Sequence, residues 1–373
     1  MMASGEHEGV KGSRGELVAS VLSGAWRASP PPAPASLTPA ALIEVAPMLL
    51  GTGAASLGWW RVRSSELGTT AAAHELRQAY RMHTLRAGRI ERQTVQAITL
   101  LRSAGVEPLL VKGWAIARLY PERGLRPYGD IDLCVRPEQH SVALEILGTA
   151  TVDVGAVDLH KGLPELRRPS LDEVYDRSEV VRLADADVRI LGSEDHLRYL
   201  CMHMLRHGAY RALWLCDVAV VLESLPEIFD WDYLLGGDRR RGDWVVCAIG
   251  LAHRLLGARV DGFPVAQRAR QLPWWLAPSV LRQWSLQTHY MNTPSLAYCM
   301  RHPSQIPRAL RLRWPNPIQA TVGVGGAFNE LPRLPFQLGE CVLRAAHYAT
   351  QMPRLIRQRS VEAVGRGDHT PVR

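Results

Sequence analysis

Residues 129–135 read Gly129-Asp130-Ile131-Asp132-Leu133-Cys134-Val135. Two carboxylates stand two positions apart in an apolar run that is typical of a β-strand. Side chains alternate between the faces of a strand, so we expect Asp130 and Asp132 on one face, roughly 6–7 Å apart. Such carboxylates repel each other unless a cation lies between them. The pair therefore predicts a Mg²⁺ or Mn²⁺ site for phosphoryl or nucleotidyl transfer. A solvated acidic strand edge is the other interpretation.

A possible phosphate-binding turn precedes the aspartates. Residues 108–111 are apolar and predict a short buried strand, and residues 114–120 predict a helix that ends before Pro121. Lys112 and Gly113 lie between them. The first backbone N–H groups of a helix favour an anion, and glycine lets a phosphate approach the backbone. We expect Lys112 and the backbone of Gly113, Trp114 and Ala115 to hold phosphates.

The turn-rich loop before the aspartates carries Arg126, and Gly129 ends it. The Arg126 guanidinium suits a phosphate, but it suits a surface ion pair with Glu122 equally well. Both interpretations stay open from the sequence.

A third carboxylate is expected downstream. A helix over about residues 137–147 and a strand over 151–160 would return the chain beside the first aspartates. Asp158 lies in the run Val-Asp-Leu and is our candidate for the third metal ligand and general base. Asp153 is the rival, on the opposite face of an unbroken strand. His160 shares the face of Asp158 and would orient the acceptor or be a polar strand end. Lys161 would reach a phosphate or be a solvated turn residue.

These segments together resemble the polymerase-β-type nucleotidyltransferase superfamily, and most closely its bacterial branch of uncharacterised nucleotidyltransferases. In that branch Lys-Gly replaces a Gly-Ser turn, Leu-Arg-Pro-x-Gly-Asp-x-Asp-Leu follows, and Asp/Glu-Leu-His comes later. The matching segments are Lys112-Gly113, Leu125-Arg126-Pro127-Tyr128-Gly129-Asp130-Ile131-Asp132-Leu133 and Val157-Asp158-Leu159-His160. With two helical segments around residues 193–218, the resemblance covers roughly residues 100–225.

The resemblance implies transfer of a nucleoside monophosphate from a nucleoside triphosphate, with ATP as the expected donor and Mg²⁺ or Mn²⁺ as the cofactor. It implies Asp130, Asp132 and Asp158 as metal ligands and catalytic residues. The phosphate- and substrate-binding set is then Lys112, Gly113, Trp114, Arg126, Gly129, His160 and Lys161. The acceptor would offer a hydroxyl or phosphate on a small molecule, a peptide or protein, or an RNA. Two alternatives are an inactive nucleotide-binding scaffold of the same fold and a helical nucleic-acid-binding protein.

The expected fold class is α+β, with a small mixed sheet between helical regions. We predict a disordered tail over residues 1–38, N-terminal helices over 39–104, a nucleotidyltransferase core over 105–192 and a C-terminal helical region over 193–373. Single helices are expected over 39–60, 70–104 and about 335–358, and one starting with Ser193 as N-cap. Residues 180–183 and 188–191 predict a hairpin whose turn carries Asp185 and Asp187 as solvated residues.

The C-terminal region contains two histidines on one helix face and an aspartate in an apolar helix. His203 and His207 share a helix face, and we expect packing or contact with the nucleotide or acceptor rather than a zinc site. Asp217 stands in an apolar helix and needs a partner if it is buried, such as an arginine or histidine of the preceding helix.

Composition limits the class of protein. The 373 residues carry a formal net charge of +8, which allows nucleic-acid or nucleotide binding without requiring it. No apolar run is long enough to span a membrane, and the first residues lack a signal-peptide pattern. Six scattered cysteines without a Cys-x-x-Cys motif predict free thiols and a cytoplasmic protein. The sequence leaves the oligomeric state open.

Overall fold

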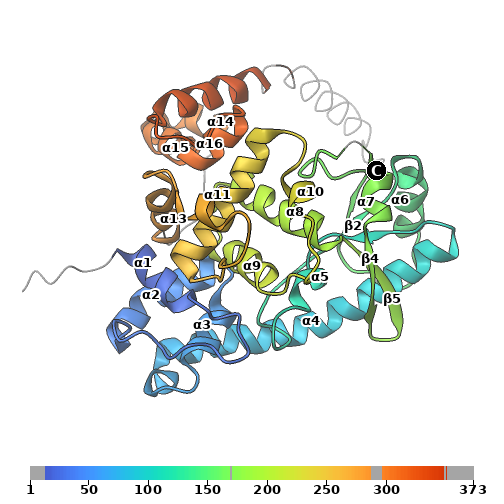
Figure 1. Ribbon diagram of the computed structural model, residues 1–373, viewed down its shortest axis with the longest axis horizontal. Helices are drawn as coiled ribbons and strands as arrows, with labels where there is room; N and C mark the ends of the chain where they lie inside the picture. Colours follow the sequence, from blue (N-terminus) through green and yellow to red (C-terminus); the bar gives the residue numbers. More distant parts are fainter. Residues whose placement is uncertain (1–12, 169, 287–295, 348–349, 351–373) are drawn as a thin grey trace, which may run out of the picture. The chain divides into compact units, whose positions relative to one another are not determined.

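The computed structural model describes residues 13–168, 170–286, 296–347 and 350. The chain divides into two units. The first comprises residues 1–291 and 327–330, and it contains the sheet and most helices (Figure 1). The second comprises residues 292–326 and 331–373.

A five-stranded mixed sheet forms the core of the first unit, and the prediction of an α+β fold is confirmed. Its strand order is β3-β2-β1-β5-β4. β2 is parallel to β3 and β1 is parallel to β5, whereas β1–β2 and β4–β5 are antiparallel. The strands are β1 (Leu109–Leu110), β2 (Ile131–Cys134), β3 (Val157–His160), β4 (Glu179–Leu183) and β5 (Ala186–Ile190).

Helices cover both faces of this sheet because its central strands are apolar on both sides. Leu110, Leu133 and Ile190 pack with residues of α4 (Ala71–Ser103) and α6 (His140–Gly148) on one face. Leu109 and Cys134 pack on the other face with α7 (Leu171–Asp176) and with Tyr199 of α8 (Ser193–Arg206). Asp132 is two positions from Cys134 on β2, so it lies on the α7–α8 face.

The crossover from β2 to β3 is short, as the sequence predicts. It consists of η2 (Pro137–Gln139) and α6, and it returns β3 parallel to β2. The strand expected over 151–160 begins only at Val157. Asp153 accepts the N–H of Gly155 at 3.2 Å, a local turn that competes with strand pairing.

The N-terminal part is more ordered than expected. Residues 14–22 form α1 (Arg14–Leu22), which starts with a capping box between Ser13 and Glu16 and buries Val18, Val21 and Leu22. This corrects the prediction of a disordered tail over 1–38 for its described part, and residues 1–12 lie outside the described residues.

The helix expected over 39–60 is two helices, α2 (Pro39–Gly51) and α3 (Ala55–Val62), because Gly53 between them has a φ of 76°. The long helix expected over 70–104 is confirmed as α4, with Thr70 as its N-cap. The short helices η1 (Glu66–Thr69) and α5 (Trp114–Ala117) complete this half of the unit.

Helices follow the β4–β5 hairpin, as predicted. α8 begins at Ser193, but its N-cap is Gly192 rather than Ser193. The helices after it are α9 (Ala212–Leu222), α10 (Trp231–Leu235), α11 (Arg239–Leu256), α12 (Ala266–Arg270) and α13 (Leu276–Trp284). The six cysteines are free, and five are buried.

The second unit is helical in its described part. It contains α14 (Leu296–Arg301), η3 (Pro303–Gln305), α15 (Ile306–Arg313), α16 (Pro317–Gly323) and a helix over residues 334–347. The last helix was expected to reach about residue 358, and that extension lies outside the described residues. None of the described helices is long and apolar enough to cross a membrane.

A buried histidine of α8 makes stability depend on pH. His196 of α8 is 4% exposed, and burial lowers its pKa to about 3, with the charges of Arg118 and Arg126 acting the same way. The unfolded chain takes up a proton near pH 6.5, whereas the folded protein does not, so stability is full above that pH and falls below it. We expect the free energy of unfolding to drop by about 2 kcal/mol for this group between about pH 7.5 and pH 5.

The measurement is urea unfolding at both pH values for the wild type and for His196→Gln. The variant should lose part of the pH dependence. His203 contributes in the same direction, because burial also lowers its pKa to about 3. If the free energy of unfolding of His196→Gln depends on pH as strongly as that of the wild type, His196 is not a source of the pH dependence.

Candidate functional site

Two predicted aspartates face each other across neighbouring strands. Asp132 of β2 pairs in register with Asp158 of β3. Directly paired residues on adjacent strands project to the same face, so both carboxylates lie on the α7–α8 side of the sheet. The Asp132 side chain is almost fully buried, whereas that of Asp158 is 58% exposed. One carboxylate is thus fixed inside the protein and the other is accessible to a ligand.

His160 joins this pair. It is two residues beyond Asp158 on β3, and its Nε2 lies 3.4 Å from Oδ1 of Asp132 and 3.4 Å from Oδ2 of Asp158. One ligand atom from each of the three residues lies within 4.8 Å of the others. Within the described residues, this is the one such cluster of potential metal ligands. Two oxygens and one imidazole nitrogen suit a divalent cation.

Lys112 contacts the buried member of the pair. Its Nζ lies 2.6 Å from Oδ1 of Asp132, and its side chain is 18% exposed. The sequence predicted Lys112 as a phosphate ligand near the aspartates. The structure confirms that the two are adjacent, and it adds a direct ion pair.

The pKa values of this group are coupled. Burial alone would raise the pKa of Asp132, but the hydrogen bond to His160 and the charge of Lys112 outweigh burial and hold the pKa below its usual value. The same hydrogen bond raises the pKa of His160, against the effect of burial and with help from Asp158. Asp132 is therefore a carboxylate at neutral pH, as a metal ligand must be.

Asp130 lies directly before the strand that carries Asp132. It is exposed and immediately precedes β2, which begins at Ile131. Strand alternation therefore does not fix its side chain beside that of Asp132, and its carboxylate lies outside the Asp132–Asp158–His160 cluster. The preceding Gly129 is approached by a basic residue that the sequence did not single out. A β-carbon added to Gly129 would lie 3.3 Å from Nη2 of Arg86 on α4.

The turn after β1 has the expected glycine but a shorter helix. Gly113 has a φ of 63° and lies close to the backbone of Asp130, with which an added β-carbon would be in contact at 3.6 Å. A side chain there would be strained. The helix expected over 114–120 is the single turn α5, which starts at Trp114 and carries little dipole. Any phosphate affinity here must rest mainly on Lys112.

Arg126 is buried, and it pairs with Asp217 rather than with Glu122. Its Nη2 and Nε lie 2.9 and 3.2 Å from the two carboxylate oxygens of Asp217 on α9. The hydroxyl of Tyr120 donates to the same carboxylate at 2.9 Å. The partner of Asp217 was expected on the preceding helix. The observed arginine comes from the 121–130 loop instead. Arg126 therefore anchors the loop that leads to Asp130.

The rival third carboxylate is elsewhere. Asp153 accepts a hydrogen bond from Gln93 at 2.7 Å and pairs with Arg89 at 3.3 Å, both on α4. Because it precedes β3 and faces α4, it does not approach Asp132. The second Asp-x-Asp lies at the β4–β5 hairpin. Asp185 is exposed in its turn, and Asp187 pairs with Arg182.

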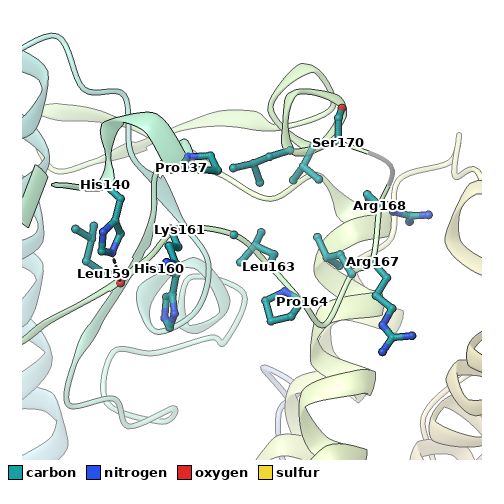
Figure 2. Close-up of a pocket in the computed structure, with 14 residues that line it drawn as sticks. Pro137, His140, Leu159, His160, Lys161, Leu163, Pro164, Arg167, Arg168 and Ser170 are labelled. Carbon is teal, nitrogen blue, oxygen red and sulfur yellow. Dashed lines mark hydrogen bonds between the residues drawn. The ribbon is translucent and has the colours of Figure 1, made fainter. Parts of the chain in front are cut away.

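Lys161 follows the cluster and leads into a cavity of about 730 Å³. Lys161 is exposed, and His160 and Lys161 line the cavity together with the loop that leads to α7 (Figure 2). Figure 2 shows His140 and His160 on one side of it and Arg167 and Arg168 on the other. His160 therefore contacts both carboxylates and lines this space, and Lys161 lines it next to His160.

Aromatic rings of α8 and α9 flank Lys112. Its Nζ lies 6.0 Å from the ring centroid of Tyr199, which stacks on His203 at 5.9 Å. His203 also contacts His207 at 4.6 Å and Trp214 at 4.8 Å. The two histidines are packed in an aromatic row, as expected, and they do not join the metal-ligand cluster.

Comparison with known proteins agrees with this geometry. The sequence model of a family described as uncharacterised nucleotidyltransferase matches residues 57–257, more than half of the 373 residues. The matched range contains the sheet, Lys112, both paired aspartates and the helices α4, α8 and α9. No curated protein and no solved structure gives a significant match. The chain belongs to this family of uncharacterised nucleotidyltransferases.

Proposed function

We propose that the protein transfers a nucleoside monophosphate from a nucleoside triphosphate, with ATP as the expected donor, to a hydroxyl or phosphate of an acceptor. The observation that carries the proposal is the register pair of Asp132 and Asp158 with Lys112 against Asp132. A buried and an exposed carboxylate beside one lysine suit a site that must bind both a cation and phosphates. We expect the reaction in the cytoplasm.

The residues present fit a divalent cation. Asp132, Asp158 and His160 offer ligand atoms within 4.8 Å of one another, and exposed Asp130 would supply a further carboxylate. Oxygen donors favour Mg²⁺, and the imidazole makes Mn²⁺ an equally suitable ion. When bound, the cation would offset the negative charge of the triphosphate and the leaving pyrophosphate.

Residues of the chain would bind the phosphates, accept the proton and orient the base. Lys112 would bind the phosphates, and Arg86 would add positive charge beside Gly129. The exposed carboxylate of Asp158 would take the proton of the acceptor hydroxyl, and His160 would orient Asp158. The acceptor oxygen would then attack the α-phosphorus, the bond from that phosphorus to the β-phosphate oxygen would break, and pyrophosphate would leave with the electron pair.

Lys112 links phosphate binding to cation binding in this proposal. Its ammonium lies 2.6 Å from the carboxylate that would hold the cation. We therefore expect Lys112→Met to weaken ATP binding by about tenfold, through the lost charge, while tightening Mn²⁺ binding in the absence of nucleotide. Calorimetric titration with Mn²⁺ alone and with ATP plus Mn²⁺ measures both effects. Equal loss of both affinities would contradict this role.

The experiment that tests the function is pyrophosphate release. Purified protein is incubated with each NTP, Mg²⁺ or Mn²⁺ and a cell extract cleared of its own nucleotides. Release that depends on the cation, on the extract and on Asp158 supports transfer. Release of inorganic phosphate in its place would contradict it.

The inactive scaffold remains the second candidate, because Asp130 lies outside the cluster and Lys112 already neutralises Asp132. A scaffold would bind ATP with a cation and release nothing. The same assay therefore separates the two functions.

A further inference from the structure

The cavity behind His160 begins where the proposed catalytic strand ends. Its lining contains Leu159 and His160 of β3, the loop over residues 161–168, and the first turn of α7 (Figure 2). His160 belongs to both places, because it is one of the residues that line the cavity and its Nε2 lies 3.4 Å from each of the two carboxylates. A molecule in the cavity would therefore contact His160, which in turn contacts the exposed Asp158.

The size and apolar character of the cavity suit a small organic molecule. Its volume of about 730 Å³ is in the range of ligand-binding pockets. Much of the lining is aliphatic or proline, namely Pro137, Leu159, Leu163, Leu166, Leu171 and Val174. A strand of RNA would need aromatic rings on which its bases stack, and the described lining contains no Phe, Tyr or Trp.

The charged part of the lining has one sign. It consists of Lys161, Arg167 and Arg168, and the described lining contains no Asp or Glu. Lys161 and Arg167 form no ion pair within the described part of the chain. Arg167 and Arg168 direct their guanidinium groups away from Leu163 (Figure 2), and Lys161 directly follows His160, which contacts both carboxylates. The cavity therefore favours a ligand with an anionic group.

The wall of the cavity is held in place before any ligand binds. Arg168 donates from Nε to Asp195 of α8 at 2.8 Å and from Nη1 to the carbonyl oxygen of Tyr233 at 2.9 Å. Both charged side chains are buried, and Leu166 is buried in the core of the α7–α8 face. A loop with two such anchors keeps its shape, which lowers the entropic cost of binding.

We propose that this cavity holds the acceptor, a small organic molecule with an apolar body and an anionic group beside the hydroxyl that is modified. The inference rests on the proposed function and deepens it. The apolar body would pack on Leu163 and Leu171, and the anionic group would pair with Lys161. The acceptor oxygen would gain the nucleotidyl group as a phosphodiester, its proton would pass to Asp158, and pyrophosphate would leave.

The test uses the full chain, α-³²P-labelled ATP and two fractions of a cell extract, separated by ultrafiltration into small molecules and macromolecules. Label should appear in a product of the small-molecule fraction. Passing that fraction over an anion-exchange resin before ATP is added should remove the acceptor activity. Label found in RNA or protein would overturn the inference while leaving the proposed function intact.

Substitutions at two positions, Leu171 and Lys161, test whether the acceptor binds in this cavity. Leu171→Trp fills it and should reduce label transfer by about tenfold or more. Val180→Trp adds a large ring at an exposed residue of β4 outside the cavity and should transfer normally. Lys161→Glu is on the surface and should raise the acceptor concentration needed for half-maximal transfer, and Lys161→Arg should restore it.

Metal-dependent ATP binding is measured for each variant beside transfer. Variants that bind ATP and transfer as the wild type does would overturn the acceptor assignment. A wild-type protein that binds no ATP and releases no pyrophosphate would instead overturn the proposed function and the inference with it. Lys161→Glu keeps the test decisive if Leu171→Trp does not fold.

Discussion

Replacing Asp132 with asparagine is expected to lower kcat/KM for nucleotidyl transfer by on the order of 10³-fold or more. The substitution keeps the size of the side chain and removes its charge. It leaves Lys112 and His160 without the carboxylate that both contact, and it removes the buried ligand of the proposed cation. Steady-state pyrophosphate release measures the change, and Mn²⁺ titration should show weaker binding in parallel.

The matched control is Asp185→Asn. Asp185 belongs to the other Asp-x-Asp of the chain, and it is exposed in the β4–β5 turn. The same chemical change there should leave kcat/KM within about twofold of the wild type, because it touches no part of the site. A stable Asp132→Asn protein with wild-type turnover would show that catalysis uses other residues.

Asp217→Ala should have the largest effect on stability, about 3–5 kcal/mol in the free energy of unfolding. Asp217 is fully buried and accepts hydrogen bonds from Arg126 and Tyr120. Burial alone would lower the pKa of Arg126, but Asp217 outweighs burial and raises it, so the guanidinium stays charged. Without its partner, that charge is left buried and uncompensated. Urea unfolding measures the loss.

Two further variants separate the charge from the packing. Tyr120→Phe removes one hydrogen bond and should cost about 1 kcal/mol. Arg126→Met combined with Asp217→Leu removes both charges and should recover most of the stability lost in Asp217→Ala. If the double variant is as unstable as Asp217→Ala, the cost comes from altered packing and not from an unpaired charge.

The sequence predicted the parts of the site that depend on strand alternation. Asp132 and Asp158 each stand in an apolar–Asp–apolar run, and the short helix between their strands requires a parallel return. Period-two alternation then brings both carboxylates to one face, which the register of β2 and β3 confirms. His160 follows from the same rule, because it is two residues beyond Asp158.

The predictions from sequence differ from the structure where a residue lies at the end of a strand or where its partner is distant in the sequence. Asp130 was expected on β2, but the strand begins one residue later, and the end of a strand is not fixed by hydrophobic pattern. The partner of Arg126 comes from α9, and no local pattern links the two. Arg86 likewise reaches Gly129 only through the packing of α4.

The helix α1 was missed for a different reason. Residues 1–38 are rich in glycine, serine and proline, so their composition predicts disorder where a nine-residue helix forms. Ser13 and Glu16 have the spacing of a capping box, which indicates a helix start. Its apolar residues Val18, Val21 and Leu22 are buried, so tertiary packing stabilises a segment whose composition suggests disorder.

The most direct test of nucleotidyl transfer uses one NTP labelled at two positions in parallel reactions. With ATP labelled at the α-phosphate, the label should enter the acceptor product. With ATP labelled at the γ-phosphate, the label should leave as pyrophosphate, and both results should disappear in Asp132→Asn. A γ-label in the acceptor product would show phosphoryl transfer and would contradict the account.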